Sequence, residues 1–213
     1  VGDNTDGVGF VRDVTERLKF RFGDCSVLVL GAGGAVRGLL GALLEASPRW
    51  LAVANRSHQR AEELADEFGV EAIHFDEIPA EHFDLIINGT TTGLHHEAPA
   101  IDPETFNDCL LAYDLVYAAD PTPFMQLAKA GGAKQVTDGL GMLIEQAAES
   151  FLLWRGVRPE TQSVYRELRA LLGLPDHVVP MAVVPLGWPA RPLGPPRRPP
   201  VRTRAHRETY GAP

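Results

Sequence analysis

A short apolar run that ends in three glycines within four positions constrains this chain most. The run and the residues after it read LVLGAGGAVR, from Leu28 to Arg37. A strand that ends in a glycine turn leaves the first N–H groups of the next helix unpaired, and those groups favour a phosphate. The pattern predicts a βαβ unit that binds a dinucleotide. Val36 stands where the G-x-G-x-x-G template has its last glycine. The alternative to a dinucleotide site is a turn that is rich in glycine for steric reasons alone.

The end of the second apolar run favours NADP over NAD. Residues Leu51–Ala54 have the composition of a buried strand, and the letters NRSHQR follow. An NAD-binding unit places an acidic residue here for the ribose hydroxyls. In this chain the position holds Asn55, and Arg56 and Arg60, four residues apart, can converge on the 2′-phosphate of NADP. Two solvated surface arginines are the alternative.

Composition excludes several classes of protein. The chain has 213 residues, of which 45% are hydrophobic and 23% charged, as in an ordinary globular protein. Its two cysteines, Cys25 and Cys109, match no metal or redox spacing, so we expect a cytoplasmic protein without a metal. No stretch is apolar enough to span a membrane, and no signal peptide opens the sequence. Because the chain begins at Val1 and leads straight into a motif, we expect it to be a fragment.

The composition changes near residue 174. From Pro175 onward the chain has six arginines, no lysine and ten of its seventeen prolines. Such a segment builds neither helices nor a core of its own. We therefore expect a domain over residues 1–173 and an extended or disordered tail over residues 174–213. A tail that binds nucleic acid is the alternative, but the lack of lysine and of interleaved aromatic residues argues against that partner.

Strands alternate with helices before that boundary. The expected strands are Ser26–Leu30, Leu51–Ala54, Ala72–Phe75, Asp84–Asn88, Leu111–Val116 and Lys134–Val136. The expected helices are Val8–Lys19, Ala35–Glu45, Gln59–Phe68, Pro123–Ala130, Leu140–Arg155 and Thr161–Leu172. Ser57 is the predicted N-cap of the third helix, and Gly69 ends it. Several strands are apolar throughout, which indicates an α/β fold with a doubly wound parallel sheet of the Rossmann type.

Polar residues at two other places are candidates for a site. Asp6, in the segment GDNTDG, is either a carboxylate at the edge of a cleft or, like Thr5, only the N-cap of the next helix. The segment NGTTTG follows an expected strand, so we expect its hydroxyls, that of Thr91 included, to line the cofactor site. An ordinary polar loop is the alternative. Tyr117 also follows an expected strand, and core packing is its alternative role.

The helix that begins near Leu140 presents two faces. Its predicted core stripe consists of Leu140, Leu143, Ile144, Ala147 and Phe151. Gly139, Met142 and Gln146 fall together on another face. A glycine at the start of a helix lets a flat ring pack close to the backbone, and Gln146 offers both a donor and an acceptor. A glycine-rich entry with a solvated glutamine is the alternative.

Six motifs in order resemble those of the shikimate dehydrogenase family, over residues 1 to about 172. They are GDNTDG, VLVLGAGGAVR, NRSHQRAEELA, FDLIINGTTTG, YDLVY with TPF, and DGLGMLIEQAAESFLLWRG. The resemblance implies an NADP-dependent enzyme that reduces 3-dehydroshikimate to shikimate, reversibly. Ser57 stands where the family usually has threonine, which keeps a hydroxyl.

The resemblance also implies a role for each candidate residue. Asp6 matches the aspartate of a catalytic lysine–aspartate pair and binds a substrate hydroxyl, with Asn4 as its neighbour. The expected cofactor residues are Gly31, Gly33, Gly34 and Ala35 at the pyrophosphate, Asn55, Arg56 and Arg60 at the 2′-phosphate, and Gly139 and Met142 at the nicotinamide. Tyr117 is expected near the junction of substrate and cofactor, and Gln146 on a substrate hydroxyl.

The sequence departs from the family at its start and at its end. The family's catalytic lysine belongs to a domain before GDNTDG, so we expect this chain to bind NADP but to turn over little substrate. A non-catalytic NADP-binding module and a quinate/shikimate dehydrogenase are the alternatives. The segments VVPLGWPA and GPPRRP of the tail resemble the C-terminal end of nitroreductase-type flavoproteins, from which we infer no FMN site. The sequence does not predict an oligomeric state.

Overall fold

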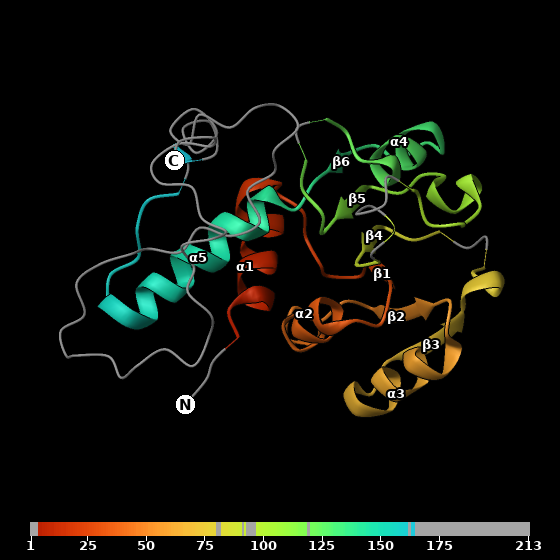
Figure 1. Ribbon diagram of the computed structural model, residues 1–213, viewed down its shortest axis with the longest axis horizontal. Helices are drawn as coiled ribbons and strands as arrows, with labels where there is room; N and C mark the ends of the chain where they lie inside the picture. Colours follow the sequence, from red (N-terminus) through yellow and green to blue (C-terminus); the bar gives the residue numbers. More distant parts are fainter. Residues whose placement is uncertain are drawn as a thin grey trace, which may run out of the picture.

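A parallel sheet of six strands forms the centre of the molecule (Figure 1). The computed structural model describes residues 4–79, 82–90, 92, 97–118, 120–161 and 163–164. The strands are β1 (Ser26–Leu30), β2 (Trp50–Asn55), β3 (Glu71–His74), β4 (Leu85–Asn88), β5 (Leu111–Asp114) and β6 (Val136–Thr137). Their order in the sheet is β3-β2-β1-β4-β5-β6, and all neighbours are parallel. This confirms the doubly wound α/β fold.

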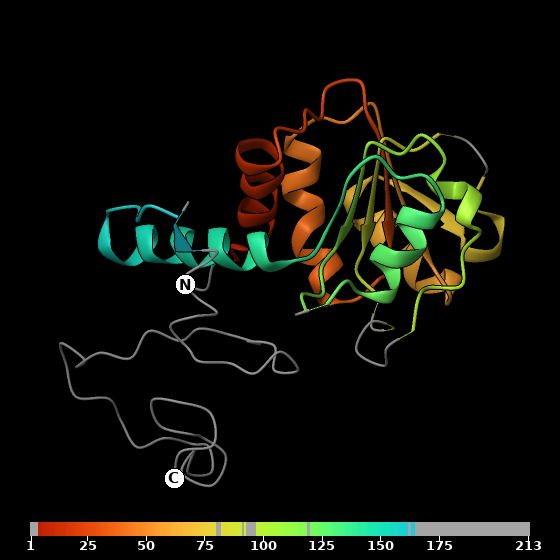
Figure 2. The same cartoon turned by 90° about the horizontal axis from the view of Figure 1, so that it is seen from above.

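Helices cover both faces of the sheet. They are α1 (Asp6–Arg12), α2 (Gly34–Glu45), α3 (His58–Phe68), α4 (Pro123–Ala130) and α5 (Leu140–Arg155). Alternate side chains of β1 enter separate clusters, because successive residues of a strand point to opposite faces. Val27 and Val29 pack with residues of α1, α2 and α3, whereas Leu28 and Leu30 pack with residues of α4 and of the turn Pro103–Phe106. Figure 2 shows α2 and α4 on opposite sides of the strands.

Helix α1 lies between α2 and α5 and approaches both through glycines. A Cβ atom at Gly7 would lie 2.7 Å from the carbonyl oxygen of Gly38 in α2. A Cβ atom at Gly9 would lie 2.7 Å from the Cα of Gln146 in α5. Because no side chain separates these backbones, α1 holds α5 firmly even though α5 projects beyond the sheet (Figure 2).

The first predicted helix, Val8–Lys19, corresponds to two elements of the structure. Helix α1 ends at Arg12, and a π-helical turn, η1 (Asp13–Arg17), follows it directly. The turn buries Asp13, whose carboxylate accepts hydrogen bonds from Arg17 Nε at 2.5 Å and from the Tyr113 hydroxyl at 2.8 Å. The same hydroxyl accepts from the backbone N–H of Met142 at 3.1 Å. One fully buried tyrosine of β5 therefore links η1 to the first turn of α5.

Two predicted N-cap residues stand at the N-cap positions, but their side chains do not cap the helices. Thr5 is the N-cap residue of α1, but its hydroxyl bonds to Gln146 and Ser150 instead of capping, and Ser57 likewise precedes α3 without a side-chain cap. Gly69 ends α3 in the left-handed conformation, as expected.

The predicted core stripe of α5 is largely wrong. The buried residues of this helix are Gly141, Ile144, Glu145 and Ala148, whereas Phe151 is 40% exposed. The contacts of α1 with α5 lie at Gln146, Glu149 and Ser150, outside the predicted stripe. The predicted helix over 161–172 and the tail over 174–213 lie almost wholly outside the described residues. Within those residues, no helix has the length and apolar character needed to cross a membrane.

The contact of α1 with α5 generates a prediction with a matched control. Gly9→Ala puts a methyl group 2.5 Å from the backbone nitrogen of Gln146, so we expect it to lower the free energy of unfolding by about 2 kcal/mol. Gly41→Ala, in α2, meets open space and should raise it by about 0.5 to 1 kcal/mol through helix propensity. Urea denaturation measures both. Equal stability of the two variants would contradict the packing described here.

Candidate functional site at the carboxyl edge of the sheet

The glycine turn after β1 is open. Gly31 adopts φ +106°, which favours glycine, and a Cβ atom there would lie 2.8 Å from the carbonyl oxygen of Gly89. Gly33 and Gly34 are exposed, and a Cβ atom on either would meet nothing within 4 Å. No side chain caps α2, so its first N–H groups face this open space. The residues present therefore fit an anion of the size of a pyrophosphate.

The departure at Val36 has a structural reason. Val36 is fully buried, and its side chain occupies the space where a Cβ atom of Gly89 would stand. The last glycine of the template usually allows α2 to pack closely on the sheet. In this chain Gly89, directly after β4, leaves that space for Val36. Gly89 is a residue that the template alone does not reveal.

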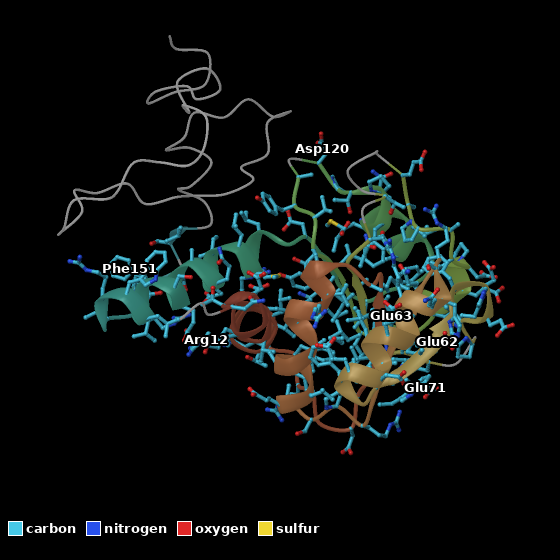
Figure 3. The ribbon with its side chains drawn as sticks, turned by 60° about the horizontal axis from the view of Figure 1, so that its bottom comes forward. Arg12, Glu62, Glu63, Glu71, Asp120 and Phe151 are labelled. Atoms are coloured by element: carbon cyan, nitrogen blue, oxygen red, sulfur yellow. The ribbon has the colours of Figure 1, made fainter. Side chains whose placement is uncertain are left out.

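The segment after β2 carries two exposed arginines. The guanidinium groups of Arg56 and Arg60 form no hydrogen bond or ion pair with a described residue. The amide of Asn55 donates to the carbonyl oxygen of Ser57 at 2.9 Å and so shapes the turn into α3. Figure 3 shows Glu62 and Glu63 on α3, and these bond to His58 and Gln59 of the same helix. Both guanidinium groups are thus available for an anion, and their convergence on one anion stays a prediction.

A buried polar pair ends β4 and β5. Asn88 and Asp114 are partners in the register of the two strands, and both are fully buried. The Asn88 Nδ2 donates to Asp114 Oδ1 at 3.0 Å, and Asn88 Oδ1 accepts from the backbone N–H and hydroxyl of Thr90 at 3.1 and 2.7 Å. The pair thereby fixes the start of the loop after β4.

Asp114 also fixes two segments after β5. Its Oδ1 accepts from the backbone N–H of Val116 at 3.1 Å, and its Oδ2 accepts from the Thr122 hydroxyl at 2.6 Å. Thr122 in turn caps α4, since its hydroxyl accepts from the backbone N–H of Met125. Burial raises the pKa of Asp114 to about 6, despite these hydrogen bonds, and the charge of Asp138 adds to the rise.

Tyr117 lies past the end of β5 and is partly buried. Its hydroxyl is buried and has no partner among the described residues, and burial raises the pKa of its phenol. A buried hydroxyl without a partner is rare and is consistent with a group that awaits a ligand. Thr91, the other candidate in these loops, lies outside the described residues.

Three of the four predicted substrate residues gather where α1 begins against α5. Asn4 Oδ1 accepts from the backbone N–H of Asp6 at 2.9 Å, and the Asp6 carboxylate forms no hydrogen bond or ion pair with a described residue. Gln146 is not a solvated glutamine, because it is partly buried and accepts from the Thr5 hydroxyl at 3.3 Å. The structure therefore brings Asn4, Asp6 and Gln146 to one region at the contact of the two helices.

Gly139 and Met142 lie at the start of α5. A Cβ atom at Gly139 would collide with the carbonyl oxygen of Leu115, so close packing on the end of β5 already requires glycine there. Met142 is partly buried against the core and is held by Tyr113. Their role beside a nicotinamide stays a prediction.

A groove of about 320 Å³ runs along α5. Its lining is mainly apolar, with Leu143, Ala147, Phe151, Trp154 and Val164 among its residues, and Gln146 and Ser150 also line it. Figure 3 places Phe151 on the part of α5 that extends furthest from the sheet. The groove adjoins the glutamine that was predicted to bind substrate, but not the glycine turn.

The fold and the open turn define an α/β domain of the Rossmann type. Residues 13–115 match the family described as Shikimate / quinate 5-dehydrogenase, and residues 139–169 match the Shikimate 5'-dehydrogenase C-terminal domain. The chain belongs to the shikimate dehydrogenase family.

Similar proteins agree with this assignment. The shikimate dehydrogenase (NADP(+)) of Nitrosomonas europaea is 46% identical over 173 residues, which are 79% of this chain and 62% of the relative. That of Chromobacterium violaceum is 49% identical over 175 residues, which are 80% of this chain and 64% of the relative. The structure of shikimate 5-dehydrogenase from Thermus thermophilus in complex with NADP(H) and shikimate superposes with a TM-score of 0.70 at 38% identity, covering 79% of this chain and 63% of that one.

The chain spans less than two thirds of the length of these curated relatives. The family matches end at residue 169 and lend no support to the resemblance of the tail to nitroreductase-type flavoproteins.

The raised pKa of Asp114 generates a prediction about stability. Because the folded pKa exceeds the ordinary value of 3.8, the folded protein binds the proton more tightly than the unfolded chain. The associated stability is present at low pH and is lost as pH rises through about 6.

We therefore expect the free energy of unfolding of the unsubstituted protein to fall, relative to that of Asp114→Asn, by about 1 kcal/mol between pH 5 and pH 7.5. Urea denaturation of both proteins at each pH measures the difference. A difference that stays constant, or one that grows in favour of the aspartate, would show that this carboxyl does not titrate in that range.

Proposed function

We propose that this chain is the NADP-binding part of a shikimate dehydrogenase, which reduces 3-dehydroshikimate to shikimate reversibly. The observation that carries the proposal is the open glycine turn with two available arginines past the next strand. Relatives that are 46% identical over 173 residues and 49% identical over 175 residues are named shikimate dehydrogenase (NADP(+)). An acidic residue that would take the ribose hydroxyls of NAD is replaced by Asn55.

Each part of the cofactor has a set of residues to hold it. Gly31, Gly33, Gly34 and Ala35 would bind the pyrophosphate through backbone N–H groups. Asn55, Arg56 and Arg60 would bind the 2′-phosphate, since guanidinium groups pair with phosphate oxygens in a fork. Gly139 and Met142 would flank the nicotinamide, which supplies a hydride when bound. Thr91 is proposed as a further contact.

The residues that we propose to bind the substrate ring lie at the junction of α1 and α5. The Asp6 carboxylate would accept a hydrogen bond from a substrate hydroxyl, and Asn4 supports the backbone at Asp6. Gln146 would present its amide to a second substrate hydroxyl. The buried hydroxyl of Tyr117 has no partner among the described residues and would also bond to a polar group of the ligand. Reduction of the ketone takes up one hydride and one proton, so a proton donor must stand near its oxygen.

Two other functions are separated from this one by simple assays. Protection against heat by NADP+ without oxidation of shikimate would support a non-catalytic NADP-binding module. Formation of NADPH from shikimate would support the enzyme. The description of the matched family includes quinate, so the rate with quinate decides which ring the site prefers.

The two arginines generate a prediction about cofactor choice. Replacing both Arg56 and Arg60 with alanine should weaken NADP+ binding by about tenfold or more for each guanidinium lost, because each would contribute charge-assisted hydrogen bonds. Binding of NAD+, which lacks the 2′-phosphate, should change by less than about twofold. Isothermal titration calorimetry measures both affinities.

The matched control replaces Arg21 and Arg49, which are also exposed and lie before β1 and β2, at the opposite edge of the sheet. It makes the same change in net charge and should leave both affinities unchanged. Equal losses for NADP+ and NAD+, or a loss in the control pair, would contradict the assignment of the 2′-phosphate to this segment.

A further inference from the structure

We propose that Asp114 is a positioning residue for the cofactor, whose carboxylate sets the orientation of the Asn88 amide and so holds residues 89 and 90, which start the loop after β4, against the glycine turn. The inference rests on the proposed function, because it concerns the same edge of the sheet. The effect of Asp114 and Asn88 on the turn passes through the backbone of residues 89 and 90.

The orientation of the Asn88 amide follows from charge. An ionised carboxylate only accepts hydrogen bonds, so the Nδ2 of Asn88 must face Asp114 and its Oδ1 must face Thr90. Two donors of Thr90, its backbone N–H and its hydroxyl, meet that oxygen, and the hydroxyl also bonds to Thr92 at 2.8 Å. The loop is therefore fixed by an amide that cannot turn over while Asp114 is charged.

The backbone of Gly89 and Thr90 lies directly opposite Gly31. A Cβ atom at Gly31 would lie 2.8 Å from the carbonyl oxygen of Gly89 and 3.1 Å from the backbone nitrogen of Thr90. The backbone N–H of Gly89 also donates to the carbonyl oxygen of Leu30 at 2.8 Å. The turn and the loop are in backbone contact, so a displacement of Thr90 moves one side of the space in which a pyrophosphate would lie.

Protonation of Asp114 would remove the constraint. A neutral carboxyl presents one donor, which can bond to Asn88 Oδ1 and so turn the amide away from Thr90. Asp138 is the charged group that acts on Asp114 from the segment between β6 and α5, and its negative charge favours the neutral form. Burial acts in the same direction. A smaller fraction of molecules then holds the start of the loop in place. The apparent affinity for the cofactor falls in proportion to that fraction.

The experiment compares NADP+ affinity of the unsubstituted protein with that of Asp114→Asn by isothermal titration calorimetry from pH 5 to pH 8. Asparagine keeps the shape and mimics the neutral carboxyl. We expect the variant to bind about fivefold more weakly at pH 8, with the ratio of the two dissociation constants approaching one at pH 5. Using the ratio cancels the titration of the 2′-phosphate itself.

Two further variants make the result specific. Asp24→Asn makes the same chemical change in an exposed turn before β1 and should give a ratio of one at every pH. Thr90→Val keeps the branched shape but loses the hydroxyl bond to Asn88, so it should weaken NADP+ binding while Asp114 is intact. It also tests the link if Asp114→Asn does not fold.

The outcomes are distinguishable. A ratio that falls towards one at low pH supports the inference, because a purely structural defect would persist at all pH values. A ratio of one throughout, or a constant ratio above one, overturns it while leaving the proposed function intact. Failure of the unsubstituted protein to bind NADP+ at any pH would overturn the proposed function and this inference together.

Discussion

The structure depends on one contact between two backbones at the centre of the sheet. The ends of β1 and β4 are neighbours, and chain order reverses between them, which is where α/β sheets of this kind open towards ligands. Here the carbonyl of Gly89 lies in the space that a side chain of Gly31 would need. Two glycines thus face each other, and the space around Gly33 and Gly34 in the turn that follows remains open.

The buried polar groups around this contact fix the position of the backbone on either side of Gly89. Asn88 and Asp114 are buried at the ends of neighbouring strands, where an apolar pair would avoid the free-energy cost of removing polar groups from water. Their hydrogen bonds join the loop after β4, the loop after β5 and the start of α4. A second buried group, Tyr113 with Asp13, holds the start of α5 in the same way. Rigid strands carry the loops, and buried hydrogen bonds set their positions.

Much of this could be predicted from the sequence because apolar runs and glycine turns are local signals. The strands, the glycine turn and the first five predicted helices agree with the structure to within a few residues. β5 ends at Asp114 rather than at Val116, because the N–H of Val116 turns back to the Asp114 carboxylate. A charged residue inside an apolar run, as in LAYDLV, was the available signal for that buried group. The pairing of Gly89 with Val36 gave no signal, since it joins distant parts of the chain.

The most direct test of the open turn is Gly33→Val. Gly33 has extended backbone angles, φ −92° and ψ −178°, that valine adopts readily, and a Cβ atom there meets nothing within 4 Å. We expect the free energy of unfolding to fall by no more than about 1 kcal/mol, because valine is a poorer N-cap than glycine, and NADP+ binding to weaken by more than about tenfold. Unchanged NADP+ binding by a stably folded variant would contradict the assignment of the pyrophosphate to this turn.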